Sequence, residues 1–145
     1  MPVPTETPSE TFEKRVRPNV DDFRADSTSE YKAQNAAYAL GHYPEWVFEY
    51  FERHDPSRLQ GAKLVREFRA QIFKECPDLE VIFDMAESGK HRFLTKGSRK
   101  ISTSSDAVMI AQGCLLLQDG RRFGDVLERA YDFCRNTLAV PMYAN

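Results

Sequence analysis

Apolar residues recur at helical spacing along much of the chain, beginning near residue 28. Ser27 and Glu30 stand three residues apart, as in a capping box, and predict the start of a long first helix. Two stripes follow along it, one of Ala36, Ala39, Leu40 and Tyr43 and one of Tyr31, Asn35, Tyr38 and His42. The small alanine side chains predict the close approach of a second helix. Pro44 predicts a kink near residues 41–44, after which the helical pattern continues from Trp46 to Phe51.

Three further segments show the same period. Apolar residues recur from Ala62 to Phe73 and predict a second helix, which ends by Cys76. Pro77 then stands where the first turn of a third helix would begin. The expected apolar face of that helix consists of Leu79, Ile82, Phe83, Ala86 and Phe93. A last helix is expected over residues 123–139, ended by Val140-Pro141.

Two segments lack this period. Residues 1–27 are rich in Pro, Thr, Ser and Glu, and we expect a flexible N-terminal arm there. Between residues 106 and 122 the short apolar runs AVMIA and CLLLQ predict a β-hairpin. The pattern therefore predicts a mainly α (α+β) fold, with three to four helices in a bundle, a small β-hairpin and a C-terminal helix. These would form one domain over residues 28–145.

Composition narrows the function classes. With 145 residues, of which 41% are hydrophobic, the chain can form one continuous core. Twenty basic and 22 acidic residues leave a net charge of −2, so the overall field does not attract nucleic acid or an anionic membrane. No run resembles a signal peptide or a membrane span, and we expect a cytoplasmic protein. Cys76, Cys114 and Cys134 lack metal-ligand spacing and predict buried thiols, with no metal and no cofactor.

The segment DMAESGKHRFL, residues 84–94, holds the densest chemistry. On a helix Asp84, Glu87 and His91 share one face, while Lys90 falls toward the apolar side. One interpretation is a small polar pocket, because a buried ammonium requires an anionic partner. The other is that Gly89 ends the helix and the two cations cap its last carbonyl groups, where positive charge is favoured. We favour the second interpretation.

His42 is the other histidine of interest, since His54 is expected to be solvated at a helix end. If the first and third helices pack antiparallel, His42 would lie near His91, and a histidine can transfer protons at neutral pH. A structural role is the more common one for a single histidine between helices. The sequence contains no glycine-rich phosphate loop and no G-x-S-x-G motif.

The order of a long Asn- and Ala-bearing helix, a middle helix and a third helix ending in Lys90-His91 resembles small bacterial proteins with HEPN-like helical folds. The resemblance covers residues 30–94. Many HEPN proteins are metal-independent ribonucleases of toxin and antiphage systems, in which a dimer brings two R-x-x-x-x-H motifs into one cleft. This chain has no R-x-x-x-x-H string, since Ala86 stands five residues before His91. The resemblance therefore implies a non-catalytic relative, of bacterial or phage origin, that uses the same surface for binding.

Two functions follow. The favoured one is a non-enzymatic interaction module that forms a homodimer or binds a protein partner. Its partner surface would be the aromatic helix from Trp46 to Phe51 and the arm, and its binding residues are expected to be Asn35, Trp46, Lys90, His91 and Arg92. The alternative is a ribonuclease or nucleotide-handling enzyme that binds RNA. In it His91 transfers a proton, Lys90 or Arg92 stabilises phosphate charge, and Glu87 or Asp84 orients His91, with His42 nearby.

Overall fold

The N-terminal segment is helical. The computed structural model describes residues 6–88, 94–95, 115–117 and 119–139. Helix α1 (Pro8–Thr11), a π-helical stretch (Phe12–Val16) and α2 (Arg17–Ala25) follow one another directly. A capping box begins them: the Thr7 side chain accepts a hydrogen bond from the Glu10 N–H, and the Glu10 carboxylate accepts one from the Thr7 N–H.

The prediction of a flexible arm is therefore wrong for residues 8–25. Four apolar side chains of this segment lie on one helix face and are at most 4% exposed, namely Phe12, Val16, Val20 and Phe23. Their spacing of four, four and three residues is helical, but the polar composition around them obscured it. Four buried apolar side chains stabilise a segment of this length against disorder.

Helix α3 (Glu30–His54) is the longest element and runs through Pro44 without ending. Its cap is Ser29, whose hydroxyl accepts a hydrogen bond from the Lys32 N–H at 3.1 Å. The helix thus begins at Glu30, and the cap is Ser29 and not the predicted Ser27. The predicted stripe from Ala36 to Tyr43 is buried, as expected.

Helices α4 (Val65–Glu75) and α5 (Pro77–Ser88) match the second and third predicted helices. A short 3₁₀ turn (Pro56–Leu59) precedes them. Phe68 and Ile72 carry the buried face of α4. On α5 the buried residues are Leu79, Ile82 and Met85, while Phe93 of the predicted apolar face lies outside the described residues.

The last helix is α7 (Phe123–Phe133), continued by a π-helical turn (Cys134–Leu138), as predicted. Ion pairs join it to two other helices. Arg24 of α2 donates two hydrogen bonds of 2.7 Å to the carboxylate of Glu128. Arg129 donates one of 2.6 Å to Asp78 of α5. Such partly exposed pairs orient the helices more than they stabilise them.

A two-stranded antiparallel pair connects β1 (Leu94–Thr95) with β2 (Leu116–Leu117). Leu94 pairs with Leu117, and Thr95 with Leu116. Of the hairpin predicted over residues 106–122, the first strand lies outside the described residues. Within the described residues, β2 pairs with β1, a segment that precedes the predicted hairpin.

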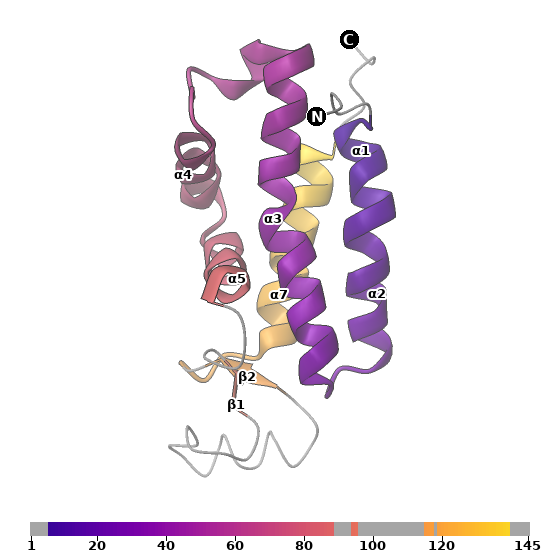
Figure 1. Ribbon diagram of the computed structural model, residues 1–145. Coiled ribbons are helices and arrows are strands. Elements are labelled where there is room, and N and C mark those ends of the chain that lie inside the picture. Colours follow the sequence, from indigo (N-terminus) through magenta and orange to yellow (C-terminus); the bar gives the residue numbers. More distant parts are fainter. Residues whose placement is uncertain (1–5, 89–93, 96–114, 118, 140–145) are drawn as a thin grey trace.

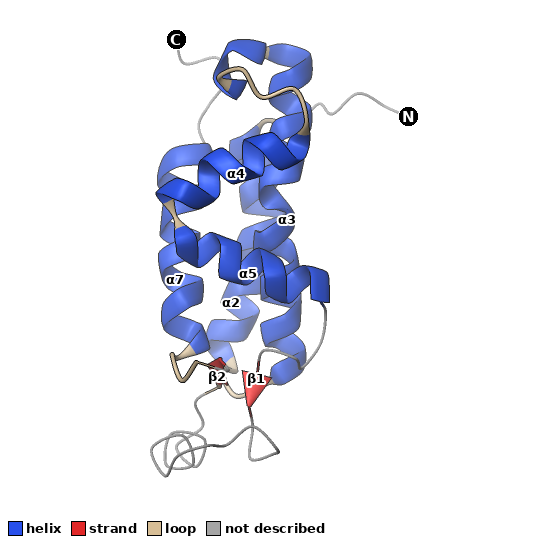
Figure 2. Cartoon of the chain, turned by 90° about the vertical axis from the view of Figure 1, so that its left-hand side faces the viewer, coloured by secondary structure: helices blue, strands red, loops and turns tan. Residues whose placement is uncertain are grey.

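Helices α2, α3 and α7 run along the long axis of the molecule (Figure 1). Seen from the side, α4 and α5 cross in front of α3 and α7 (Figure 2). One core of buried side chains, including Leu40, Ile82 and Leu127, joins the long helices to α5. The mainly α fold predicted from the sequence is confirmed.

Candidate functional site

His42 lies between two carboxylates where α3 meets α5. Its Nε2 is 3.3 Å from Oε2 of Glu87 on α5, and its Nδ1 is 3.2 Å from Oε1 of Glu45, one turn further along α3. The His42 side chain is only 15% exposed, whereas that of Glu87 is 54% exposed. A protonated imidazole donates from both nitrogens, so one ring can satisfy both carboxylates.

The close contact of α3 and α5 depends on Gly41. A Cβ at this position would lie 3.1 Å from both the Cβ of Ala86 and the Cα of Phe83. Non-bonded carbon atoms in contact are ordinarily about 3.5–4.0 Å apart, so the two helices approach more closely than an alanine at position 41 would allow. His42 and Glu87 directly follow Gly41 and Ala86, which places them against each other at the same crossing.

Aromatic rings cover the imidazole of His42. The Tyr38 ring lies 4.5 Å from it, centroid to centroid, and the Phe83 ring meets it edge-on at 6.0 Å. On α5 the contact of His42 is thus Glu87, while His91, which His42 was predicted to approach, lies outside the described residues. An imidazole oriented by a carboxylate can transfer a proton or hold a hydrogen-bonding ligand.

Asp84, another candidate of residues 84–94, is not part of this contact. Asp84 lies on the exposed side of α5, and within the described residues no ion pair joins it to His42. Partial burial raises the pKa of the Asp84 carboxyl above its usual range. Lys90, His91 and Arg92 lie outside the described residues, so the roles given to them remain predictions.

Metal and thiol chemistry find no support in the described part of the chain. It contains no group of three His, Cys, Asp or Glu residues that could hold a metal ion. Cys76 and Cys134 are buried, as predicted, and desolvation raises the pKa of both thiols. Because the thiolate is the reactive form, both are poor nucleophiles. Cys114 lies outside the described residues.

The second stripe of α3 forms an exposed surface beside this site. Tyr31 is 74% exposed and Tyr38 57% exposed, and the half-buried Asn35 lies between them. We call Tyr31, Asn35 and Tyr38 the α3 ridge. Of these, only Asn35 was among the predicted binding residues. The pattern of a tyrosine stripe beside an alanine stripe could have identified the two tyrosines as well.

The partner surface predicted from Trp46 to Phe51 is wrong in large part. Phe48 and Phe51 belong to the core, at 7% and 3% exposure. Trp46, a predicted binding residue, is half-buried, and the guanidinium of Arg15 lies 5.9 Å from its ring centroid. The N-terminal segment thus covers Trp46, whereas Phe48 and Phe51 pack against Phe68 of α4, at 5.7 and 6.3 Å between ring centroids.

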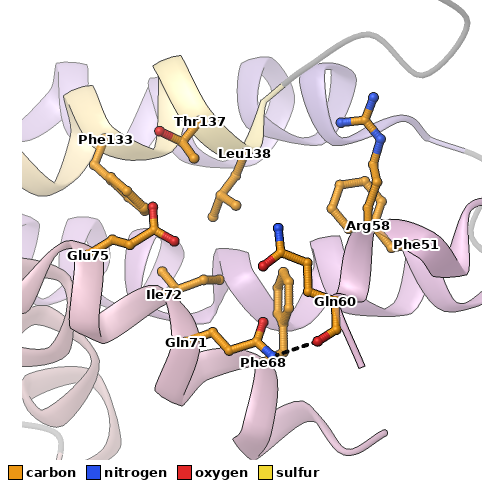
Figure 3. Close-up of a pocket in the computed structure, with 10 residues that line it drawn as sticks. All are labelled: Phe51, Arg58, Gln60, Phe68, Gln71, Ile72, Glu75, Phe133, Thr137 and Leu138. Carbon is orange, nitrogen blue, oxygen red and sulfur yellow. Dashed lines mark hydrogen bonds between the residues drawn. The ribbon is translucent and has the colours of Figure 1, made fainter. Parts of the chain in front are cut away.

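A cavity of about 170 Å³ lies near the C-terminal end of α3, between α4 and the turn after α7 (Figure 3). Its lining combines apolar side chains with polar ones: Phe51, Arg58, Gln60, Phe68, Gln71, Ile72, Glu75, Phe133, Thr137 and Leu138. The amide of Gln71 donates a hydrogen bond of 3.4 Å to the carbonyl oxygen of Gln60. Ligand pockets are commonly about 300–1,000 Å³, so this one is small. Sequence analysis missed it because the lining comes from separate segments without a motif.

Comparison with known proteins assigns the chain to no family. No family model, no curated protein and no solved structure matches the chain. Among the described helices, none combines the length and the apolar character needed to cross a membrane.

Proposed function

We propose that the chain is a non-enzymatic interaction module that pairs with a second copy of itself through the α3 ridge. The observation that carries this proposal is the exposure of Tyr31 and Tyr38, 74% and 57%, on a helix whose other large apolar side chains are buried or half-buried. Tyrosine is enriched at protein interfaces and among the residues that contribute most to binding.

The α3 ridge is nearly symmetric about Asn35. Tyr31 stands four residues before Asn35 and Tyr38 three residues after it, so all three share one helix face. In an antiparallel pair of α3 helices, Tyr31 of one copy faces Tyr38 of the other, and the two Asn35 side chains meet. An amide both donates and accepts hydrogen bonds, so it can pair with its own copy. This is the self-complementarity that a two-fold dimer requires.

A disulfide at the two-fold axis tests this arrangement. In a chain carrying Cys114→Ser, Asn35→Cys should form a covalent dimer under mild oxidation. Glu49→Cys is the control on the same helix, because Glu49 is more exposed than the half-buried Asn35 and lies about 21 Å further along α3. The proposal predicts rapid cross-linking of Asn35→Cys and little of Glu49→Cys. Equal cross-linking of the two variants, or none in either, would contradict it.

A second candidate function is metal-independent cleavage of RNA or handling of nucleotides. It is supported by the contact of His42 with Glu87, because a carboxylate-oriented imidazole suits proton transfer. Lys90, His91 and Arg92 follow Glu87 within five residues. The proposed resemblance to HEPN-like proteins, many of which are ribonucleases, also supports this candidate.

The test of this second candidate is incubation of the wild-type protein with a mixed RNA pool, beside His42→Ala and His91→Ala. Cleavage that either substitution abolishes, with the fold retained, would support the enzyme. Intact RNA with the wild-type protein would contradict it.

A further inference from the structure

Helix α4 carries cations that lack ion pairs. Nine basic residues in the described part of the chain pair with carboxylates: Lys14, Arg15, Arg17, Arg24, Lys32, Arg58, Arg121, Arg129 and Arg135. Arg66, Arg69 and Lys74 have no such pair among the described residues. Helix α4 has two acidic residues: the Glu67 carboxylate accepts the N–H groups of Lys63 and Leu64, and Glu75 lines the cavity near Phe51.

These three cations line one surface hollow of about 300 Å³ between α4 and α5, which we call the α4 hollow. It is lined by Arg66, Arg69, Ala70, Phe73 and Lys74 of α4 and by Glu80 of α5. Both helices lie on the side of the molecule that faces the viewer in Figure 2. Three positive charges against one negative charge make the hollow cationic.

The charges are spread along the hollow and are separated by apolar side chains. The five residues of α4 follow helical spacing, so they share one face. Arg66 and Lys74 are about 12 Å apart along the axis, at 1.5 Å per residue. The exposed Ala70 and the half-buried Phe73 lie between them. Arg69 is held in place by the ring of Phe83, 4.6 Å from its guanidinium carbon.

We propose that the α4 hollow binds an acidic segment of a partner protein, with carboxylates on the arginines and lysine and an apolar side chain between them. Because the hollow is cationic, charge complementarity requires a negatively charged partner segment. The spread of the cations favours several carboxylates over one phosphate group. The carboxylate of Glu80 at the edge repels a continuous phosphate chain but can accept an N–H of a peptide.

The probe is a fluorescein-labelled peptide of alternating glutamate and leucine, titrated with the full chain. Arg66→Glu with Lys74→Glu should weaken binding at least about tenfold, because each reversal replaces an attraction by a repulsion. The control is Arg53→Glu with Arg122→Glu, which changes the net charge equally at two exposed sites away from the hollow. Binding by the control should stay within about threefold of the wild type. Circular dichroism confirms the fold of each variant.

Three results would overturn this inference. The first is no saturable binding of the peptide, and the second is equal weakening in both double variants, which would reflect net charge alone. The third is displacement of the peptide by an oligouridylate of equal charge at lower concentration, which would indicate a nucleic-acid site. The α4 hollow and the α3 ridge lie on different helices, so the Arg66→Glu, Lys74→Glu variant should keep the dimer mass. Failure of one proposal is thus distinguishable from failure of the other.

Discussion

The hydroxyl of Tyr43 donates a hydrogen bond of 2.6 Å to the carbonyl oxygen of Pro8. This bond joins the middle of α3 to the first turn of the N-terminal helices, 35 residues earlier. The Tyr43 ring also packs edge-on against Phe12, at 5.4 Å between centroids. Burial raises the pKa of the Tyr43 hydroxyl far above its usual range, so it remains a donor at all ordinary pH values.

Tyr43→Phe should therefore destabilise the protein. The substitution keeps the ring and its packing but removes the Tyr43 hydrogen bond to the buried Pro8 carbonyl, which still accepts one from the Phe12 N–H, at a cost of about 0.5–1.5 kcal/mol. Urea unfolding followed by circular dichroism measures this loss. An unchanged midpoint would show that the N-terminal helices do not depend on this bond.

Tyr131→Phe is the matched comparison and should have no such cost. Tyr131 is 1% exposed, and its hydroxyl has no hydrogen-bond partner in the described part of the chain. Removing an unsatisfied buried hydroxyl is expected to be neutral or stabilising by up to about 1 kcal/mol. If Tyr131→Phe lost as much stability as Tyr43→Phe, the Tyr131 hydroxyl would have to be bonded.

Gly41→Ala should separate α3 from α5. The added Cβ would lie 3.1 Å from the Cβ of Ala86, so the helices must move apart, at a cost of about 1–3 kcal/mol. That cost exceeds the gain of about 1 kcal/mol from helix propensity. Gly124→Ala in α7 is the control, because its Cβ would meet only the Phe23 ring at 3.8 Å. The midpoint of thermal unfolding should be lower than that of the wild type for Gly41→Ala and equal or higher for Gly124→Ala. The reverse order would refute the close crossing.

The start of α4 should be sensitive to acid. Hydrogen bonds from the backbone N–H groups of Lys63 and Leu64 hold the pKa of Glu67 below its usual value of 4.5. A lowered folded-state pKa gives stability that is present above the unfolded pKa and is lost as the pH falls through the folded one. The melting temperature of the wild type should therefore exceed that of Glu67→Gln at pH 7, and the difference should disappear at acidic pH. A difference that is constant with pH would contradict this role of the charge.

The helices with strong apolar period were predictable from the sequence. The buried residues of α4, α5 and α7 recur at helical spacing, and Pro77 marks the start of α5 as expected. The N-terminal helices were not predicted, because Phe12, Val16, Val20 and Phe23 are buried only by contact with distant helices. Composition alone does not contain that information.

The candidate site was predictable in part. His42 and Glu87 were both candidates, but their contact depends on the crossing at Gly41, which a pattern within one helix cannot reveal. The cavity near Phe51 and the α4 hollow are formed by residues that carry no motif and meet only in the folded chain.

The mass of the protein in solution tests the central proposal most directly. Light scattering after size-exclusion chromatography should give twice the chain mass of 16.7 kDa for the wild type. Tyr31→Ala with Tyr38→Ala should give the chain mass, because the variant removes both exposed rings of the α3 ridge. Leu64→Ala, which truncates a 46% exposed side chain elsewhere, should keep the dimer. A wild type that has the chain mass at every concentration, or a dimer that survives loss of both tyrosines, would contradict the proposal.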